Sequence, residues 1–335
     1  MTKTTRIWTD VDFEKEGKQV GWLHLPYSVT RSAYGTIAMP IAVIRNGRGP
    51  TAFLMSGNHG DEYEGQIALC KLIRELDHGG IQGRVIVLPA ANFPAAMAGA
   101  RVSPLDGGNL NRSFPGNPEG GPTMQIAHYI ETVLMPMADI FHDYHSGGSS
   151  LQYVPFCSTY QGTDAGRNER AIAALKAFGA PVGLIWRRMS DPGLSVGAAF
   201  RNEVVALGGE FGGAGTVAIP CLQIVERGIR NLLTHVGILP TGKIVPPEKP
   251  MRFVEVVDRS YYVYAPDNGL FEPFVELGAR IEKGQPCGQV HFVDDPARTP
   301  VPCSFRASGS VFCKRQFGRV ERGDCVAHLA TDIKQ

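Results

Sequence analysis

Short runs of apolar residues recur along the first 238 residues, separated by segments with helical spacing. Such runs predict buried strands where glycine, proline or asparagine flanks them. "TAFLMSG" and "RVIVLPAAN" are clear examples, because the interior of each run is apolar. The segments predicted as strands are 20–27, 35–47, 51–57, 84–92, 139–145, 182–186 and 203–213.

Between these runs, apolar residues repeat every three or four positions, which predicts amphipathic helices. The first helix starts after Glu64, and "HGG" at 78–80 is expected to end it. A loop rich in glycine, proline and asparagine is expected from about residue 94 to 122. Further helices are predicted over 123–138, 166–180 and 219–237. The alternation predicts an α/β fold in which helices cover a mostly parallel or mixed sheet.

Four prolines mark a boundary after residue 238. "ILPTGKIVPPEKP" cannot continue a helix or a central strand, because proline has a fixed φ and no N–H. Beyond it, short β-type runs such as "YYVYAP" and "GQVHFV" alternate with glycine turns. The pattern predicts a larger domain over 1–238, a linker over 239–252 and a small all-β domain over 253–335.

The composition is that of an ordinary globular protein, with 335 residues, 43% of them hydrophobic, and a net charge of +1. A near-neutral chain has no strongly basic surface for nucleic acid or for a membrane. The seven cysteines are scattered and form no Cys-x-x-Cys pair, which is typical of reduced thiols. The N-terminal stretch has no apolar signal core. We therefore expect a cytoplasmic protein that binds neither nucleic acid nor membrane.

"MSGNHGDEYEG" places two candidate metal ligands where an apolar strand gives way to a helix. His59 and Glu62 are three residues apart, so they can point the same way from a turn or a first helical turn. Zinc takes nitrogen and oxygen ligands, and open α/β sheets bind ligands at the C-terminal ends of their strands. The alternative is a solvated polar loop, because a His-x-x-acid pair is frequent by chance.

"DIFHDYHSGG" is the best source of a third ligand. His142 and His145 point to opposite faces of a strand, so at most one of them joins the site. His145 stands at the end of the strand, whereas His142 is expected to be a packed or surface residue. Asp143 could hold the ligand imidazole in one tautomer.

"ALGGEFGG" brings Glu210 to the end of another apolar strand, among glycines that leave room for water and substrate. A desolvated glutamate can take a proton from an attacking water and then return it to a leaving amine. An exposed acid in a glycine turn is an equally good interpretation of this stretch.

Two arginines stand in the glycine-rich loop "ARVSPLDGGNLNRSFPG" (100–116). A guanidinium binds a carboxylate through two parallel hydrogen bonds, and a second one could stabilise the charge on a carbonyl oxygen. Long loops in compact domains are often functional. The alternative is that Arg101 and Arg112 are solvated loop charges.

In this order, "GNHGDEYEG", "DGGNLNRSFPG", "DYHSGG" and "GGEFGG" together resemble the succinylglutamate desuccinylase/aspartoacylase family, a branch of the zinc carboxypeptidase-like fold. "APDNGLFEPFVELGARIEKGQPCGQV" is similar to the barrel-like C-terminal domain of that family. The resemblance extends from about residue 35 to the end of the chain. It implies a zinc-dependent amide hydrolase domain followed by a barrel-like β domain.

The resemblance also implies roles for the matched residues. His59, Glu62 and His145 correspond to the ligands of one zinc ion per chain, and Glu210 corresponds to the catalytic general acid/base.

The loop residues have counterparts in the family as well. Arg101 corresponds to an arginine that polarises the scissile carbonyl, and Asn111 with Arg112 corresponds to the pair that grips the substrate α-carboxylate. The aspartoacylase branch also uses a tyrosine of its C-terminal domain, for which the candidates here are Tyr261, Tyr262 and Tyr264.

Within the family, "MSGNHGDEYEGQIAL" and "GNLNRSFPGNPEGGPT" look most like deacetylases of ectoine breakdown, which remove acetate from N-α-acetyl-L-2,4-diaminobutyrate. The resemblance implies this small-molecule substrate and suggests functional coupling to an ectoine hydrolase. Asp191 and Glu203 are candidate partners of the substrate ammonium, although acids in such places are more often plain surface residues.

Other functions are also compatible with the sequence. The enzyme could hydrolyse succinylglutamate or acetylaspartate, or it could be a metallocarboxypeptidase. A carrier protein is a weaker alternative, because no modification hairpin surrounds Lys283. Cys157 could serve a cysteine hydrolase, but free cysteines are more often small core residues. The sequence does not determine the oligomeric state.

Overall fold

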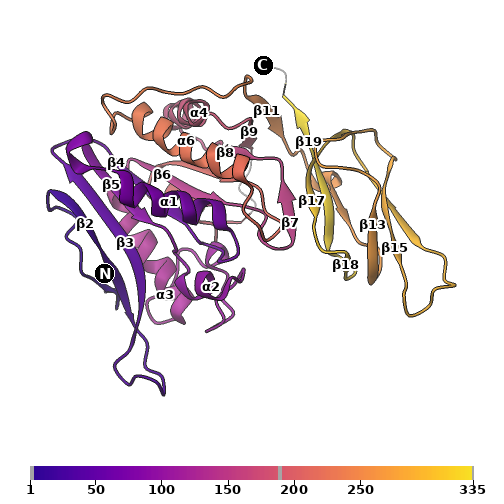
Figure 1. Cartoon of the computed structure of the whole chain (residues 1–335), viewed down its shortest axis with the longest axis horizontal. Helices are drawn as coiled ribbons and strands as arrows, with labels where there is room; N and C mark the ends of the chain where they lie inside the picture. Colours follow the sequence, from indigo (N-terminus) through magenta and orange to yellow (C-terminus); the bar gives the residue numbers. More distant parts are fainter. Residues whose placement is uncertain (1–3, 188–190, 334–335) are drawn as a thin grey trace.

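The computed structural model describes residues 4–187 and 191–333. Its main feature is a mixed sheet of fifteen strands within these residues, with the order β1-β2-β3-β5-β4-β6-β10-β8-β9-β11-β19-β17-β14, while β12 pairs with β19 and β7 pairs with β17 (Figure 1). The strands are β1 (Trp8–Thr9), β2 (Gly17–Pro26), β3 (Thr36–Asn46), β4 (Thr51–Ser56), β5 (Gly83–Leu88), β6 (Ile140–His145), β7 (Leu151–Tyr153), β8 (Phe156–Tyr160), β9 (Val182–Trp186), β10 (Val205–Glu210), β11 (Arg252–Glu255), β12 (Tyr262–Tyr264), β14 (Arg280–Ile281), β17 (Gly309–Arg315) and β19 (Cys325–Asp332).

The centre of the sheet is parallel, as the alternation of strands and helices predicts. Strands β5, β4, β6 and β10 run parallel to one another, while β1, β2 and β3 are added antiparallel at one side. Strand β8 is antiparallel to β10 but parallel to β9. The expected mostly parallel or mixed α/β sheet is therefore confirmed as a mixed sheet.

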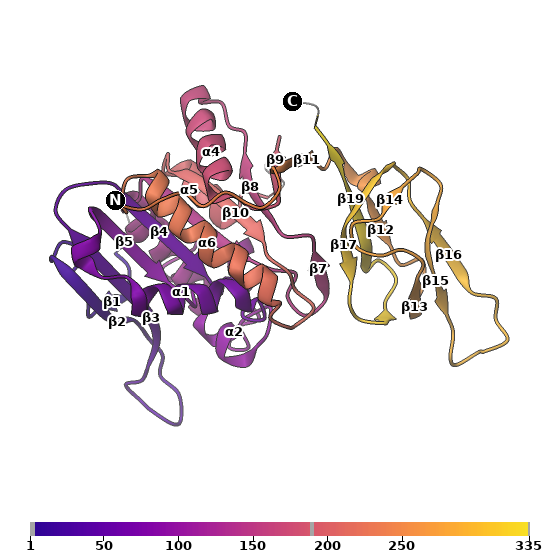
Figure 2. The same ribbon diagram turned by 45° about the horizontal axis from the view of Figure 1, so that its top comes forward.

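Helices cover both faces of this sheet. On one face, α1 (Tyr63–Glu75), α4 (Ala165–Phe178) and α6 (Ile219–His235) pack over a core that includes alternate residues of β4 such as Leu54 (Figure 2). On the other face, α3 (Pro122–Tyr129) and α5 (Ser195–Arg201) pack over a second core that includes Phe53. Because successive side chains point to opposite faces, a strand buried on both faces is an unbroken apolar run.

Two local predictions need correction. The first helix ends at Glu75, and "HGG" forms a separate 3-10 turn (His78–Gly80), because the backbone is already extended at Leu76 and Asp77. The segment expected to be a loop contains the helix α2 (Phe93–Ala98), which has a proline in its first turn and ends at left-handed Gly99, and a 3-10 turn, η2 (Leu110–Arg112). Proline near a helix start and glycine after its end are ordinary helix signals.

The chain beyond the proline-rich segment forms the remaining strands. A second sheet has the order β16-β15-β13-β18 and faces strands of the main sheet across an apolar core that includes Val290 and Val311. Its strands are β13 (Gly269–Pro273), β15 (Pro286–His291), β16 (Val301–Ser304) and β18 (Arg319–Val320).

Strand pairing links the C-terminal strands directly to the α/β part. Strand β11 runs parallel to β9 and antiparallel to β19, and β17 pairs with β7. One continuous sheet therefore runs through both parts of the chain (Figure 1). Among helices of the described residues, none is long and apolar enough to cross a membrane.

Candidate active site

Three neighbouring parallel strands bring the predicted site residues to one edge of the sheet. His145 and Glu210 are the last residues of β6 and β10, and they are register partners. His59 and Glu62 lie in the short connection between β4 and α1. Because β4, β6 and β10 are adjacent and parallel, their C-terminal ends meet, and the ligands predicted from distant parts of the sequence converge there.

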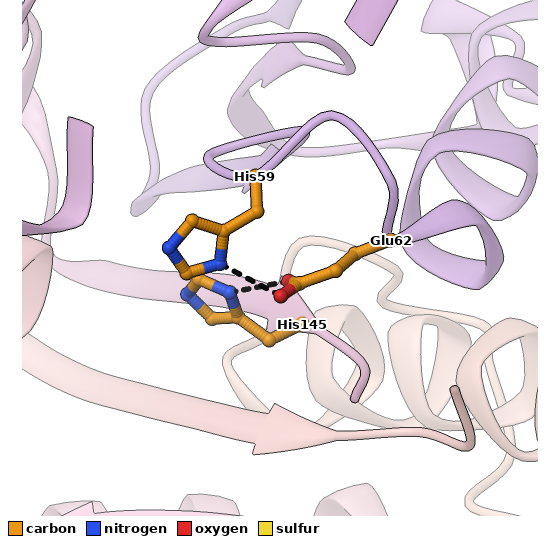
Figure 3. A group of neighbouring side chains, drawn as sticks. All are labelled: His59, Glu62 and His145. Carbon is orange, nitrogen blue, oxygen red and sulfur yellow. Dashed lines mark hydrogen bonds and ion pairs between the residues drawn. The ribbon is translucent and has the colours of Figure 1, made fainter. Parts of the chain in front are cut away.

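The His59 and His145 rings lie next to each other, and both point toward the Glu62 carboxylate (Figure 3). The Nδ1 atom of His59 lies 2.7 Å from Oε1 of Glu62, and Nδ1 of His145 lies 2.7 Å from Oε2. One donor atom from each of the three residues falls within 4.8 Å of the others. All three side chains are buried. The arrangement has the nitrogen and oxygen donors and the spacing that suit a single divalent ion.

The outer nitrogens of both imidazoles have other partners. Nε2 of His59 is 3.1 Å from the side-chain oxygen of Asn109, and Nε2 of His145 is 2.9 Å from the Asp143 carboxylate. Partners that accept a hydrogen bond keep a proton on Nε2, so the Nδ1 lone pairs face Glu62. Lone pairs that face a carboxylate require a cation between them, which is the chemical reason why the group fits a metal.

Electrostatics at this group follow from burial and charge. Burial raises the pKa of Glu62, but the two imidazoles beside it outweigh burial and hold that pKa well below its usual value. Burial lowers the pKa of His145, whereas the carboxylates of Asp143 and Glu62 raise it, and the net pKa lies well above the usual range. A buried cation, either a proton or a metal ion, is thus favoured at this position.

Asp143 organises the surroundings of His145, in line with the role expected for it. Its Oδ2 accepts hydrogen bonds from the Asn58 amide at 2.8 Å and from the Ser195 hydroxyl at 2.5 Å, besides the contact with His145. The carboxylate is itself 1% exposed. Asn58 and Ser195 were not predicted from the sequence. Asn58 is adjacent to the His59 motif, but no sequence signal distinguishes Ser195, which reaches the site from α5.

The glycines around the motif act by allowing close approach. Gly57 has a φ of 66°, in the left-handed region that favours glycine. A side chain at Gly60 would overlap the backbone of Ala95 in α2. The turn between β4 and α1 can therefore press against α2, and this packing fixes the direction in which His59 points.

Glu210 faces the pocket next to this group. Its Oε2 is buried and has no hydrogen-bond partner among the described residues. Burial raises its pKa well above the usual value, and the nearby Glu62 raises it further, while His145 and Arg101 act in the opposite direction. A buried carboxyl that prefers to hold a proton is suited to general acid/base chemistry. The interpretation as an exposed acid in a glycine turn is wrong.

The loop residues line the same pocket, but they are more exposed. The side chains of Arg101 and Arg112 are each 48% exposed, and Arg101 approaches Glu62 at 3.5 Å. Arg112 contacts the Asp191 carboxylate at 3.2 Å. The Asn111 side chain lies 3.3 Å from Nε2 of His145 and accepts a hydrogen bond from the Ser195 N–H. Both arginines therefore reach the pocket as expected, and about half of each side chain is exposed.

The pocket itself has a volume of about 300 Å³. Sequence reasoning missed most of its wall, which includes residues of β7, β8, β9 and β12. Of the three candidate tyrosines, only Tyr262 lines this pocket within the described part of the chain. The newly found residues of the wall include Tyr153, Phe156, Ser158, Tyr160, Trp186, Leu194 and Val196.

Two alternatives are not supported by the packing. His142 is completely buried on the opposite face of β6, where its ring lies 3.9 Å from that of Tyr144, so it is a packed histidine as expected. Cys157 is also completely buried, and burial raises the pKa of its thiol well above the usual value. A thiol in that state is not available as a nucleophile.

A partly buried glutamate, a group that could hold a divalent ion and two arginines surround one small pocket, an arrangement typical of metal-dependent hydrolases. Comparison with known proteins defines the class as a hydrolase that acts on amide bonds. Residues 48–236 match the succinylglutamate desuccinylase/aspartoacylase catalytic domain. An N-α-acetyl-L-2,4-diaminobutyric acid deacetylase of Halomonas elongata is 42% identical over 328 residues, which are 98% of this chain and 96% of that protein.

Solved structures resemble the chain over nearly its whole length. A product-bound structure of the ectoine utilization protein EutE (DoeB) from Ruegeria pomeroyi has a TM-score of 0.94 and 37% identity, and covers 98% of this chain and 99% of that one. A succinylglutamate desuccinylase/aspartoacylase from Rhodobacter sphaeroides has a TM-score of 0.93 and 39% identity, and covers 98% and 100%. The chain belongs to the succinylglutamate desuccinylase/aspartoacylase family.

Proposed function

We propose that this protein removes the acetyl group from N-α-acetyl-L-2,4-diaminobutyrate and releases acetate and L-2,4-diaminobutyrate. The observation that carries the proposal is the 42% identity, over nearly the whole of both chains, with the deacetylase of Halomonas elongata that is named for this substrate. The likeness to an ectoine utilization protein in its product-bound form supports the same reaction.

We propose that His59, Glu62 and His145 hold one zinc ion per chain. Their donor set, mutual distances and burial support this assignment. When bound, such an ion supplies Lewis-acid chemistry, which polarises a carbonyl and makes water a better nucleophile near neutral pH. Asp143 and Asn109 position the two imidazoles through their outer nitrogens.

Glu210 is proposed as the proton carrier of the reaction. Its carboxylate takes a proton from the attacking water as the C–O bond forms, and the carboxylic acid then delivers that proton to the departing nitrogen as the C–N bond breaks. The raised pKa of this side chain suits the second step. The lining glycines Gly208 and Gly209 leave space beside it for the substrate.

The arginines are proposed to orient the substrate. Arg101 lies beside Glu62, where its guanidinium can stabilise the negative charge that develops on the carbonyl oxygen. Arg112, helped by Asn111, is proposed to bind the α-carboxylate. Holding both ends of the amide in place reduces the entropy cost of reaching the transition state.

Several wider expectations remain proposals. They are the zinc carboxypeptidase-like origin of the fold, the barrel-like character of residues 253–335, the linker over 239–252, a cytoplasmic location and coupling to an ectoine hydrolase. Hydrolysis of succinylglutamate or acetylaspartate is the alternative function, because the family name covers those activities.

The substrate assignment is tested by measuring the release of the acid from four compounds with the purified, zinc-loaded enzyme. The compounds are N-α-acetyl-L-2,4-diaminobutyrate, its N-γ-acetyl isomer, N-succinylglutamate and N-acetylaspartate. We expect the first to be hydrolysed with the highest kcat/KM. A higher kcat/KM for N-succinylglutamate or for N-acetylaspartate would contradict the proposal and assign the protein to another branch of the family.

The role of Glu210 is tested by the substitution Glu210→Gln. We expect kcat to fall by about 10²- to 10⁴-fold, because the amide can neither accept nor donate the transferred proton as a carboxyl group does. The zinc content, measured by atomic emission, should stay the same, since Glu210 is not among the proposed ligands. Glu169→Gln, at an exposed position of α4, is the matched control. Undiminished turnover in Glu210→Gln would exclude this residue as the acid/base.

A further inference from the structure

An aromatic surface forms the wall of the pocket on β8 and β9. Tyr160 and Trp186 are register partners in these parallel strands, so their side chains point to the same face. Their rings are stacked, with centroids 5.9 Å apart and an interplanar angle of 21°. Both side chains are partly buried and line the pocket, as does Tyr262 of β12. We call Tyr160, Trp186 and Tyr262 the aromatic wall.

The charged groups of the pocket leave no spare acid for a cationic ligand. Asp143 and Glu210 are the acidic residues among the described lining residues. Asp143 is already bonded to His145, Asn58 and Ser195, and Glu210 is the proposed proton carrier. Arg101 and Arg112 add positive charge. An ammonium group of the substrate therefore has to be stabilised without a free carboxylate.

The candidate acids from the sequence do not solve this problem. The Asp191 carboxylate is held by Arg112 and by the N–H of Gly193. Glu203 lies beside Arg167, two residues before β10, whose other end carries the site residue Glu210. Neither is among the residues that line the pocket. Sequence position suggested both residues, but the carboxylate of Asp191 is already paired with Arg112 and that of Glu203 with Arg167.

We infer that the aromatic wall, through the ring faces of Tyr160 and Trp186, binds the side-chain ammonium of the substrate amino acid and selects for it by cation–π attraction. The inference rests on the proposed function and deepens it. The negative face of an aromatic ring attracts a cation, most strongly for tryptophan, and the attraction grows when water is excluded. Each ring of this stacked pair keeps one face that the other ring does not cover, and that face is the surface proposed for the ammonium.

The three functional groups of the substrate, its amide, its α-carboxylate and its side-chain ammonium, fit this assignment. The amide must lie by Glu210 and the His-Glu-His group, and the α-carboxylate lies at Arg112 in the proposed mode. The remaining side chain ends in an ammonium, and the aromatic wall is a part of the pocket that neither the amide nor the α-carboxylate needs in the proposed mode. Tyr160 remains an uncharged phenol, because burial raises its pKa to about 12. Its ring and hydroxyl oxygen therefore act without a formal charge.

The test compares two substrates of the same shape, N-α-acetyl-L-2,4-diaminobutyrate and N-α-acetyl-L-norvaline, in which a methyl group replaces the ammonium. In Trp186→Leu, we expect the ratio of their kcat/KM values to fall by about five- to thirtyfold, which is the range of a desolvated cation–π contact. Trp186→Phe should give a smaller fall in this ratio than Trp186→Leu, because phenylalanine keeps a cation–π face, although a weaker one than that of tryptophan. Tyr160→Phe should nearly preserve the ratio and Tyr160→Leu should lower it.

Controls separate recognition from folding. Turnover of the neutral substrate by Trp186→Leu reports that the variant is folded and active. Trp22→Leu removes a 48% exposed tryptophan outside the pocket and should leave the ratio unchanged. An equal loss of kcat/KM for both substrates in Trp186→Leu would mean that the aromatic wall only packs against the acetyl group or shapes the pocket. This result would overturn the inference.

The outcomes also distinguish this inference from the proposed function. If the wild-type enzyme hydrolyses N-α-acetyl-L-2,4-diaminobutyrate best but the Trp186 and Tyr160 variants keep its preference for the ammonium, the aromatic wall is excluded and the function stands. If the wild-type enzyme prefers N-acetylaspartate and shows no preference for the ammonium over the methyl group, the function and the inference both fail.

Discussion

At the scale of the residue, Asp143 shows how one buried carboxylate can organise a site. It contacts His145, Asn58 and Ser195, which come from three different segments of the chain. Leaving such a group without partners would be costly. The three contacts satisfy Oδ2, whereas Oδ1 has no hydrogen-bond partner among the described residues, and the contact with His145 holds its ring in one orientation.

His142, one residue earlier, has the opposite character and makes the protein sensitive to acid. Burial lowers the pKa of His142 from 6.5 to about 3. As pH falls below 6.5, His142 binds a proton in the unfolded chain but stays neutral in the folded chain. The free energy of unfolding therefore decreases. We expect His142→Phe to remove this loss, which is about 2 kcal/mol at pH 5. The phenyl ring suits the surrounding Tyr144 and Phe178.

Urea unfolding at pH 7.5 and pH 5 measures the effect. The difference in unfolding free energy between the two pH values should shrink in His142→Phe, although not to zero, since the buried His328 has a pKa lowered to about 4 and acts in the same direction. His78→Gln replaces an exposed histidine and should leave the difference in unfolding free energy between the two pH values unchanged. An unaltered pH dependence in His142→Phe would contradict the assignment.

At the scale of the element, the contact between α4 and α6 depends on a glycine. Gly228 of α6 lies against the ring of Phe178 in α4, and a Cβ atom there would overlap that ring. Phe178 is completely buried, so it has little room to move. We expect Gly228→Ala to lower the free energy of unfolding by about 1–3 kcal/mol, the usual cost of overpacking, although alanine is the better helix former.

A second helical glycine offers a matched control. Gly166 is exposed in the first turn of α4, and the nearest atom to an added Cβ is Asp164 Oδ1 at 3.5 Å, an ordinary contact. Gly166→Ala should leave stability unchanged or raise it by up to about 1 kcal/mol. If urea unfolding shows equal stability for both variants, the two helices adapt to the added methyl group and the packing argument is wrong.

At the scale of the whole molecule, an apolar cluster joins the α/β part to the C-terminal strands. Phe156 of β8 and Phe312 of β17 have ring centroids 4.8 Å apart, and Val254 of β11 belongs to the same cluster. Because the sheet is also continuous across this region, we expect both parts to unfold together. Phe312→Ala should lower the unfolding free energy by about 3–5 kcal/mol and should shift a single transition.

Calorimetry and urea unfolding followed at two probes, near-UV circular dichroism and tryptophan fluorescence, measure this cooperativity. Phe274→Ala, which truncates a 48% exposed side chain of the C-terminal strands, should change the unfolding free energy by no more than about 0.5 kcal/mol. Two separate transitions, with Phe312→Ala affecting one of them, would show that the predicted linker over 239–252 divides two independent folding units.

The sequence by itself located most of the elements and pointed to the candidate metal group. Hydrophobic periodicity is a local property, so it located strands such as β4 and helices such as α6. His59, Glu62 and His145 were predictable because parallel strands place their C-terminal ends at one edge. The same rule brought Glu210 beside them.

Only the tertiary structure decided what lies around these residues. The contacts of Ser195, the pairing of Tyr160 with Trp186 and the choice of Tyr262 depend on the order of strands in the sheet and on which face each side chain occupies. Those features arise from contacts between segments far apart in the sequence, and no local pattern encodes them. The state of Glu210 was decided in the same way, because burial depends on the packing of the whole chain.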